Sequence, residues 1–160
     1  MAEIVTAQEL TNKIGYLRSQ KKDLVVVATN GCFDLLHIGH IRSLQKAKSL
    51  GDVLVVGINS DSSVKTIKGP NRPINNENHR AEVLAALASV DFVTIFPEST
   101  ANKFLETLKP NIYVKGSEYN SNDLPEASMI NKLGGKIIQI PMVPEASTTN
   151  IIERIKTLDC

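Results

Sequence analysis

Five short apolar runs, rich in Val and Ile, alternate along the chain with segments whose apolar residues recur at helical spacing. Several runs are continuous instead of alternating with polar residues, which is typical of strands covered on both faces in a parallel sheet. The predicted strands are residues 24–28, 53–58, 92–96, 112–114 and 136–140. The predicted helices are residues 7–20, 39–50, 77–90, 100–109, 123–133 and 147–158.

This alternation predicts an α/β fold, a doubly wound five-stranded parallel sheet built from βαβ units. We expect the Rossmann-like strand order 3-2-1-4-5, numbering the predicted strands along the chain. Because no repeat, low-complexity tract or linker divides residues 1–160, we expect a single domain, with residues 1–21 as an N-terminal helical extension. Ligands of such folds bind beyond the carboxyl ends of the strands, where the strand order reverses. The polar segments after the strands are therefore the candidate functional residues, with ordinary polar surface loops as the alternative.

The composition narrows the kinds of partner. The 160 residues include 18 Lys and Arg against 17 Asp and Glu, a formal net charge of +1. Such a chain has no broad basic surface for nucleic acid, so a phosphate ligand would have to be held by a few placed groups. Only two cysteines, no apolar leader and no apolar run long enough to span a bilayer predict a cytoplasmic protein without a membrane partner.

Two of the three histidines fall within four residues, directly after the first predicted strand, in the string GCFDLLHIGH. His37 and His40 precede Leu44 by seven and four residues, so both are expected to face the edge of the sheet at the start of a helix. That end of a helix presents unpaired N–H groups and a partial positive charge, which together favour an anion.

Three interpretations of this pair compete. The histidines could be structural, or they could hold a metal, although no third ligand is evident in the sequence. In the third and favoured interpretation, the imidazoles donate hydrogen bonds to phosphate oxygens as charge develops there.

A cationic segment follows the second predicted strand. Lys65, Lys68 and Arg72 share nine residues with Gly69, Pro70 and Pro73. This segment is either a solvated surface loop or a mobile clamp for the phosphates of a nucleoside triphosphate.

Arg80 favours the clamp. It precedes Val83, Leu84 and Leu87 by three, four and seven residues, which places it on the core face of its helix. An arginine there either points into a cleft or is buried at a cost of several kcal/mol, and a phosphate cleft would satisfy its charge.

The last predicted helix opens with three hydroxyl side chains. Ser147 is a candidate N-cap. Thr148 lies three, four and seven residues ahead of Ile151, Ile152 and Ile155, on the face expected to point inward.

Several common motifs are absent. The chain has no GxGxxG, no GxxxxGK[ST] and no GxSxG, so a dinucleotide-binding domain, a P-loop ATPase and an α/β-hydrolase are not supported.

The string GCFDLLHIGH resembles the HxGH motif of the nucleotidyltransferase superfamily, and the Gly31–Asp34 portion narrows the resemblance to its cytidylyltransferase-like branch. Further segments over roughly residues 22–156 resemble the D-glycero-β-D-manno-heptose 1-phosphate adenylyltransferases. They are Asn59-Ser60-Asp61, Lys68-Gly69 with Arg72-Pro73 and Arg80, Ser89-Val90-Asp91, Val114-Lys115-Gly116, and Ser147-Thr148-Thr149-Asn150-Ile151-Ile152.

The resemblance implies a nucleotidyltransferase in which a sugar 1-phosphate attacks the α-phosphorus of ATP and pyrophosphate leaves with Mg²⁺. It implies catalytic roles for His37, His40, Lys68 and Arg80. It implies nucleotide contacts by Asn30, Gly31, Cys32, Phe33, Gly39, Arg72, Lys115, Gly116, Ser147, Thr148 and Thr149. The implied sugar-phosphate contacts are Asp34, Asn59, Asp61 and Tyr119. No protein ligand for a metal is implied, since Mg²⁺ would bind the nucleotide phosphates.

The resemblance also implies a homodimer and a separate sugar kinase that supplies the substrate, because related domains are often fused to such a kinase. The string Lys115-Gly116-Ser117-Glu118-Tyr119 departs from the usual KGGDY-like string, which leaves the sugar open. The alternatives are a cytidylyltransferase acting on a polyol phosphate such as glycerol 3-phosphate, and a non-catalytic nucleotide-binding module.

Overall fold

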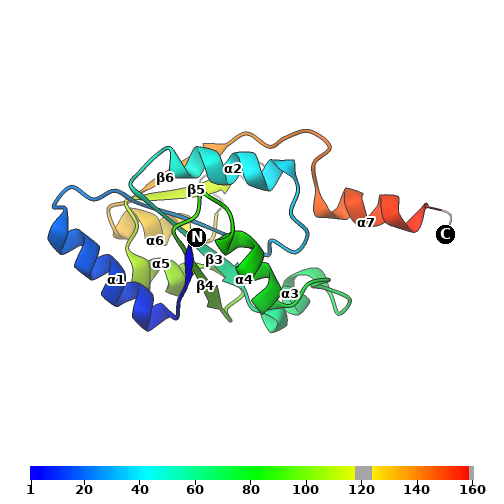
Figure 1. Ribbon diagram of the computed structural model, residues 1–160, viewed down its shortest axis with the longest axis horizontal. Coiled ribbons are helices and arrows are strands. Elements are labelled where there is room, and N and C mark those ends of the chain that lie inside the picture. The colour runs from blue at the N-terminus through cyan, green and yellow to red at the C-terminus, as the bar shows by residue number, and fades with distance from the viewer. Residues whose placement is uncertain (118–123, 159–160) are drawn as a thin grey trace.

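A parallel β-sheet with helices against both faces forms the body of the computed structural model, which describes residues 1–117 and 124–158 (Figure 1). In the described residues the sheet has six strands in the order β1-β4-β3-β2-β5-β6, and every pair is parallel. The strands are β1 (Glu3–Ile4), β2 (Val26–Gly31), β3 (Val53–Asn59), β4 (Phe92–Phe96), β5 (Ile112–Gly116) and β6 (Lys136–Ile140).

The five predicted strands occur in the predicted spatial order, and the prediction of a parallel α/β fold is confirmed. The strand count was wrong, because β1 pairs with the edge strand β4 through Glu3 and Ile4. The N-terminal segment is therefore not wholly helical. A strand of two residues is too short to show a period in the sequence, and only its pairing with β4 defines it.

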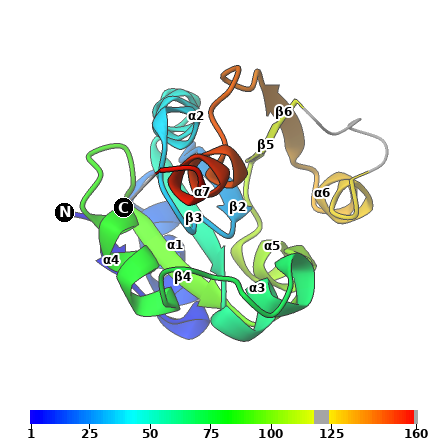
Figure 2. The ribbon, with the colours of Figure 1, turned by 90° about the vertical axis from the view of Figure 1, so that its right-hand side faces the viewer.

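The described helices are α1 (Ala7–Gln20), α2 (Ile38–Lys48), α3 (Asp61–Lys68), α4 (Glu77–Ala85), α5 (Asn102–Leu108), α6 (Ala127–Lys132) and α7 (Thr148–Lys156). Five of the seven described helices pack against the sheet, α2 and α4 on one face and α1, α5 and α6 on the other (Figure 2). Leu44 of α2 and Leu84 of α4 belong to one core cluster. The other cluster contains Ile14 of α1, Leu105 of α5 and Ile130 of α6. Strand β3, between β2 and β4, is buried along its whole length, as its continuous apolar run predicts.

Helix α3 lies within the segment that the sequence predicted as a cationic loop. Ser60 caps it by accepting a hydrogen bond from the backbone N–H of Ser63, and Val64 of the helix is buried. The helix is short and has few apolar residues, so no helical periodicity is visible in its sequence. The Gly and Pro residues that follow it favoured a loop instead.

Helix α7 differs from the inward-facing helix that its apolar stripe predicted. No residue of α7 is buried, and the helix projects from the body of the molecule (Figure 1). Ile155 is 57% exposed, and Leu158, just beyond the helix, is 59% exposed. No helix among the described residues combines the length and apolar character that crossing a membrane requires.

Candidate functional site

A cavity of about 540 Å³ opens beyond the carboxyl ends of the strands. Parallel strands end at the same edge of a sheet, so the segments that follow them converge there. The cavity is lined by these residues of the predicted site: Asn30, Gly31, Cys32, Phe33, Asp34, His37, Gly39, His40, Asn59, Lys68, Arg72, Lys115, Gly116, Ser147, Thr148 and Thr149. Asp61 and Arg80 do not line it, and Tyr119 lies outside the described residues.

The two histidines form a stacked pair at the start of α2. Their ring centroids lie 3.8 Å apart with an interplanar angle of 27°, and His40 also packs against the ring of Phe33 at 5.1 Å. Burial lowers the pKa of both rings, and the neighbouring His37 adds to the effect on His40, whose pKa falls to about 4. Both imidazoles are therefore neutral at pH 7.

Nδ1 of each histidine is buried and has no hydrogen-bond partner among the described residues. Nε2 is then the ring atom through which each neutral imidazole can donate to a ligand in the cavity.

Glycine at position 39 is required by close packing against His37. A Cβ at this position would lie 2.9 Å from Nδ1 and 3.0 Å from Cε1 of the His37 ring. Any larger residue would move the imidazole from its present place. The glycine between the histidines thus sets the geometry of the pair.

Phe33 has a positive φ of 47°, which is uncommon for a large side chain. The ring is nonetheless buried, and it lies so close to Gly31 that a Cβ there would be 3.1 Å from the Phe33 ring. This backbone conformation is held by packing on both sides, and it turns the chain from β2 toward the histidines.

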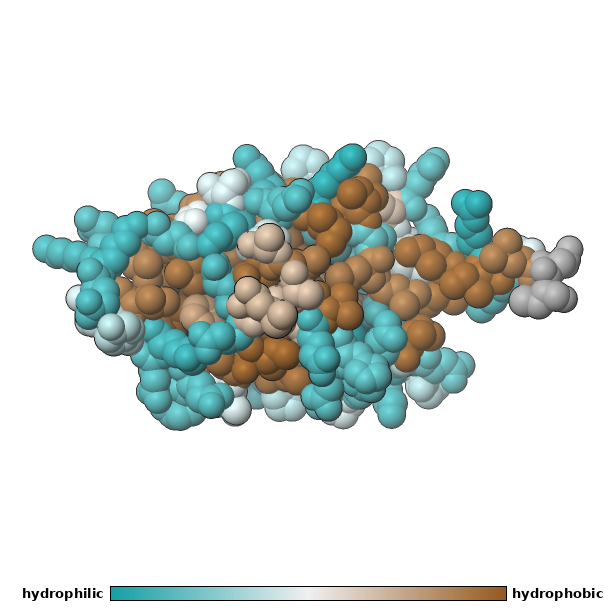
Figure 3. Space-filling model, viewed as in Figure 1, coloured by the Kyte–Doolittle hydropathy of each residue, from teal (hydrophilic) through white to brown (hydrophobic). Residues whose placement is uncertain are grey.

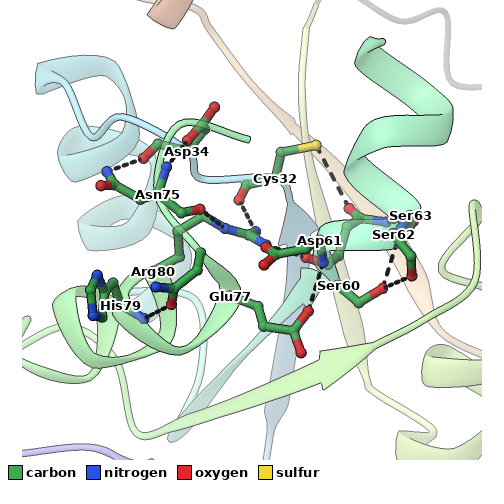
Figure 4. A network of polar contacts seen from close by, with 12 residues as sticks. Cys32, Asp34, Ser60, Asp61, Ser62, Ser63, Asn75, Glu77, His79 and Arg80 are labelled. Atoms are coloured by element: carbon green, nitrogen blue, oxygen red, sulfur yellow. Dashed lines mark hydrogen bonds and ion pairs between the residues drawn. The ribbon is translucent and has the colours of Figure 1, made fainter. Parts of the chain in front are cut away.

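The Asp34 carboxylate anchors the segment between α3 and α4. It pairs with Arg72 Nε at 2.6 Å and accepts hydrogen bonds from the backbone N–H groups of Ile74 and Asn75. Figure 4 shows Asp34 beside Asn75. Burial alone would raise the pKa of Asp34, but these hydrogen bonds and Arg72 hold it below its ordinary value. The carboxylate oxygens are occupied by these partners, so Asp34 positions this segment in the structure, and its contact with substrate stays a prediction.

Arg80 is buried in a network at the ends of β2 and β3 instead of lining the cavity (Figure 4). Its guanidinium donates to the carbonyl oxygens of Cys32, Asn59 and Asn75 at 2.6, 2.8 and 3.0 Å. It also pairs with Asp61 Oδ1 at 2.8 Å. In this structure the two charges pair with each other and neither residue lines the cavity, so the phosphate contact of Arg80 and the substrate contact of Asp61 stay predictions.

Asn59 joins α3 to the segment after β4. Its side-chain amide donates to Ser63 Oγ at 2.9 Å and to the carbonyl oxygen of Glu98 at 3.2 Å. The thiol of Cys32 lies 4.0 Å from Asn59 Oδ1, and burial raises the pKa of this thiol. Cys32 is thus a protonated wall residue at neutral pH.

Two lysines bring positive charge to the cavity. Lys68 is the exposed last residue of α3, and Lys115 lies with Nζ 5.6 Å from the centroid of the Tyr113 ring. The Tyr113 hydroxyl donates to Asn30 Oδ1 and so connects β5 with β2. Both lysines lie where they can offset the charge of a bound phosphate.

The start of α7 is part of the cavity wall. Ser147 caps the helix by accepting from the backbone N–H of Asn150 at 3.0 Å, as predicted. The Thr148 hydroxyl donates to the carbonyl oxygen of Leu35 at 3.0 Å, which ties this end of α7 to the histidine segment.

Several residues that line the cavity were not among the site residues predicted from the sequence. Ser99 and Thr100 follow β4 by three and four residues, and proximity to a strand end could have identified them. Glu126 precedes α6, far in the chain from any motif, and no pattern marked it. The other lining residues outside the prediction include Ser43, Ile67, Leu124, Pro125, Met142, Val143 and Ala146.

The described residues contain no group of three His, Cys, Asp or Glu side chains that could hold a metal ion. The carboxylates of Asp34 and Asp61 are already paired with arginines. A divalent metal at this cavity would therefore need oxygens of a bound ligand to complete its coordination.

Comparison with known proteins identifies the family of this fold and site. A model of the family described as "Cytidylyltransferase-like" matches residues 28–154. The chain is 48% identical over 136 residues to the "Bifunctional protein HldE" of Syntrophotalea carbinolica and 50% identical over 132 residues to that of Geotalea uraniireducens. These alignments cover 85% and 82% of this chain, but only 28% and 27% of the relatives. The chain thus spans about a third or less of the length of the curated relatives it matches.

Solved structures agree with this assignment. The crystal structure of the lipopolysaccharide core biosynthesis protein from Thermoplasma volcanium is 33% identical, with a TM-score of 0.63, over 75% of this chain and 97% of that chain. Pantothenate synthetase from Thermus thermophilus shares the fold, with a TM-score of 0.68 at 15% identity over 98% of this chain and 70% of that chain. Because the family model covers residues 28–154 and the HxGH residues meet at the cavity, the chain belongs to the cytidylyltransferase-like family.

Proposed function

We propose that this chain transfers an adenylyl group from ATP to D-glycero-β-D-manno-heptose 1-phosphate, giving ADP-heptose and pyrophosphate for surface glycan synthesis. The observation that carries the transfer chemistry is the stacked, neutral His37–His40 pair in the cavity beyond the strand ends. The choice of sugar is supported by the identity to the bifunctional HldE proteins and to the lipopolysaccharide core biosynthesis protein.

In this reaction an oxygen of the sugar phosphate attacks the α-phosphorus of ATP in line. The bond from the α-phosphorus to the bridging oxygen of the β-phosphate breaks, and pyrophosphate leaves with the electron pair. No general base is needed, because the attacking phosphate oxygen is already ionised at neutral pH. His37 and His40 donate hydrogen bonds from Nε2 to the α-phosphate oxygens, where negative charge is stabilised in the transition state.

The charged side chains divide into two groups. Lys68 and Lys115 line the cavity and neutralise phosphate charge. Arg72 also lines the cavity, and its ion pair with Asp34 fixes the orientation of the guanidinium. In that orientation it would contact the β- and γ-phosphates. Arg80 acts behind the wall, because it holds the carbonyl oxygens of the segments that carry these groups.

Mg²⁺ is expected to enter with the triphosphate, whose oxygens supply the ligands that the described side chains do not. Addition of a chelator in excess of the metal should abolish turnover, and restored Mg²⁺ should recover it. Activity that persists in the chelator would contradict this dependence.

The test is pyrophosphate release from ATP, CTP and GTP in combination with heptose 1-phosphate, other sugar 1-phosphates and glycerol 3-phosphate. ATP with heptose 1-phosphate should give the highest kcat/KM. If CTP with glycerol 3-phosphate is preferred instead, the chain is a polyol-phosphate cytidylyltransferase. If no pair releases pyrophosphate while ATP still binds, it is a nucleotide-binding module.

His37→Ala and His40→Ala separate catalysis from binding. Each should lower kcat by about 10²–10³-fold, the usual effect of losing one such donor, with nucleotide affinity largely retained. His79→Ala is the control, since His79 is exposed and does not line the cavity. Full activity in both cavity variants would contradict the proposed roles.

The cellular setting completes the proposal. The enzyme would act in the cytoplasm, where ATP is available, and would receive its sugar 1-phosphate from a separate kinase. The exposed apolar side chains near the C-terminus support a homodimer.

A further inference from the structure

Part of the cavity wall comes from the helical layer opposite the histidines. His40 lies in α2 and His37 is the residue before it, and α2 packs on the same face of the sheet as α4. Thr100 precedes α5 and Glu126 precedes α6, and these two helices pack on the other face. The cavity therefore crosses the edge of the sheet from one layer to the other.

Glu126 is the one carboxylate on this second side of the lining, and it is only 4% exposed. Among the described residues, the Glu126 side chain has one hydrogen bond. The backbone N–H of Ala101 donates to Oε1 at a long 3.2 Å. No described cation forms an ion pair with it.

Asp34 shows what a structural buried carboxylate looks like in the same molecule. It is 3% exposed, yet it binds Arg72 and two backbone N–H groups. The described residues give Glu126 no such set of partners, and its side chain lines the cavity, where a ligand can supply hydrogen-bond donors to the carboxylate.

The chemistry of the cavity restricts those donors. The Glu126 carboxylate would repel a phosphate, whereas Lys68 and Lys115 would attract it. The neutral rings of His37 and His40 could donate hydrogen bonds to it. The part of a substrate that reaches Glu126 must supply hydrogen-bond donors and bring no further negative charge, because a carboxylate accepts hydrogen bonds and donates none. In the proposed reaction, the O–H groups of the sugar meet both conditions.

Resting on the proposed function, we propose that Glu126, with the hydroxyl of Thr100, forms the subsite for the polyol part of the acceptor. The carboxylate accepts hydrogen bonds from sugar hydroxyl groups, while the sugar's phosphate points toward the histidines. Glu126 is then a specificity-determining residue for the sugar, and the nucleotide does not contact it.

The test compares Glu126→Gln with wild type in steady-state kinetics, varying ATP and heptose 1-phosphate separately. The substitution keeps the size of the side chain and the oxygen that faces Ala101, but it removes the charge. The KM for the sugar phosphate should rise about 10- to 100-fold, the usual range for a hydrogen bond to a charged group, while the KM for ATP stays unchanged. Glu106→Gln, the same change on the exposed side of α5, is the control and should alter neither constant.

Two further measurements separate recognition from a structural effect. With an analogue that lacks the hydroxyl bound by Glu126, the ratio of variant to wild-type KM should shrink toward one. Thr100→Val keeps the shape of the side chain and should raise the KM for the sugar phosphate about 3- to 10-fold, so the proposal remains testable if Glu126→Gln does not fold.

The outcomes are distinguishable. If wild type is active and neither Glu126→Gln nor Thr100→Val changes the KM for the sugar phosphate, the subsite is overturned and the proposed function stands. Equal increases in the KM for ATP and for the sugar phosphate also overturn the subsite, because they indicate general distortion. Wild type that is inactive with every sugar 1-phosphate overturns the proposed function and the subsite together.

Discussion

At the scale of single residues, the polar side chains of the cavity differ in how completely they are bound. Asp34 is saturated by its partners, whereas the imidazoles of His37 and His40 keep a buried Nδ1 without one. The partners of Asp34 hold the backbone in place, whereas the histidine rings line the cavity and can donate to a ligand through Nε2. This difference separates the positioning residue from the proposed catalytic ones in this site.

The buried His40 predicts a pH-dependent stability. Its pKa is about 4 in the folded protein against an ordinary 6.5, so the folded state binds fewer protons than the unfolded state between these values. The contribution of His40 to the free energy of unfolding should therefore be complete above pH 6.5. It should be lost progressively as the pH falls toward 4. Urea unfolding at several pH values measures this loss.

His40→Gln should reduce that pH dependence, because the titrating ring is gone. His79→Gln, a change at the exposed histidine, should leave the slope of wild type intact. Identical slopes for His40→Gln and wild type would contradict the burial of a neutral His40.

A side chain at position 39 should lower the rate by displacing the His37 ring. In Gly39→Ala the new methyl group would meet the His37 ring at 2.9 Å and push it aside. We expect kcat to fall by about tenfold or more, since small misplacements of a catalytic group are costly. Gly15→Ala is the matched control, because a Cβ there has no neighbour within 4 Å, and it should fold and react like wild type. Equal activity of the two variants would show that His37 need not hold this position.

At the scale of elements, Arg80 joins three separate segments behind the wall of the cavity. The carboxyl end of β2, the end of β3 and the segment before α4 each offer a backbone carbonyl to Arg80. One guanidinium with fixed donors can satisfy all three, which a lysine cannot do.

Arg80→Met should therefore destabilise the fold. It leaves three carbonyls without their donor, and each buried group left unsatisfied costs about 1–3 kcal/mol. It also removes the cation that pairs with the partly exposed Asp61. Urea unfolding at neutral pH measures the difference. Arg42→Met, on the exposed side of α2, is the control and should stay within about 0.5 kcal/mol of wild type. A loss as small as the control's would contradict the structural role of Arg80.

At the scale of the whole molecule, two core clusters on opposite faces of the sheet leave one edge open, and the cavity occupies that edge. Helix α7 stands apart from both clusters. Its apolar side chains contribute to a hydrophobic strip on the projecting end of the molecule (Figure 3). Exposed apolar surface of this kind commonly marks an interaction site.

The proposed homodimer uses that strip. Wild type should sediment as a dimer at micromolar concentration, and Ile155→Lys should shift it toward monomer, because a charge would be buried on association. Val83→Lys is the matched control, an exposed apolar residue on α4 that is away from α7. Wild type that stays monomeric, or a dimer indifferent to Ile155→Lys, would contradict the use of α7.

The sequence by itself determined the alternation of strands and helices, the order of the five main strands and the residues that gather at the strand ends. Each of these follows from local periodicity and from the general geometry of parallel sheets. The HxGH string and Gly39 were also visible, because a motif is a local pattern. Even the buried face of Arg80 followed from its helical spacing.

Only the tertiary structure decided which polar groups are occupied. Spacing placed Arg80 inward but could not tell a cleft from a ring of carbonyl acceptors, since those acceptors come from three separate segments. The same limit hid β1, which exists through its pairing with β4, and the exposure of α7, whose stripe suits a core or a partner equally well. Glu126 belongs to the cavity because distant loops meet there, and hydrogen bonding and burial between distant segments are not encoded in any local pattern.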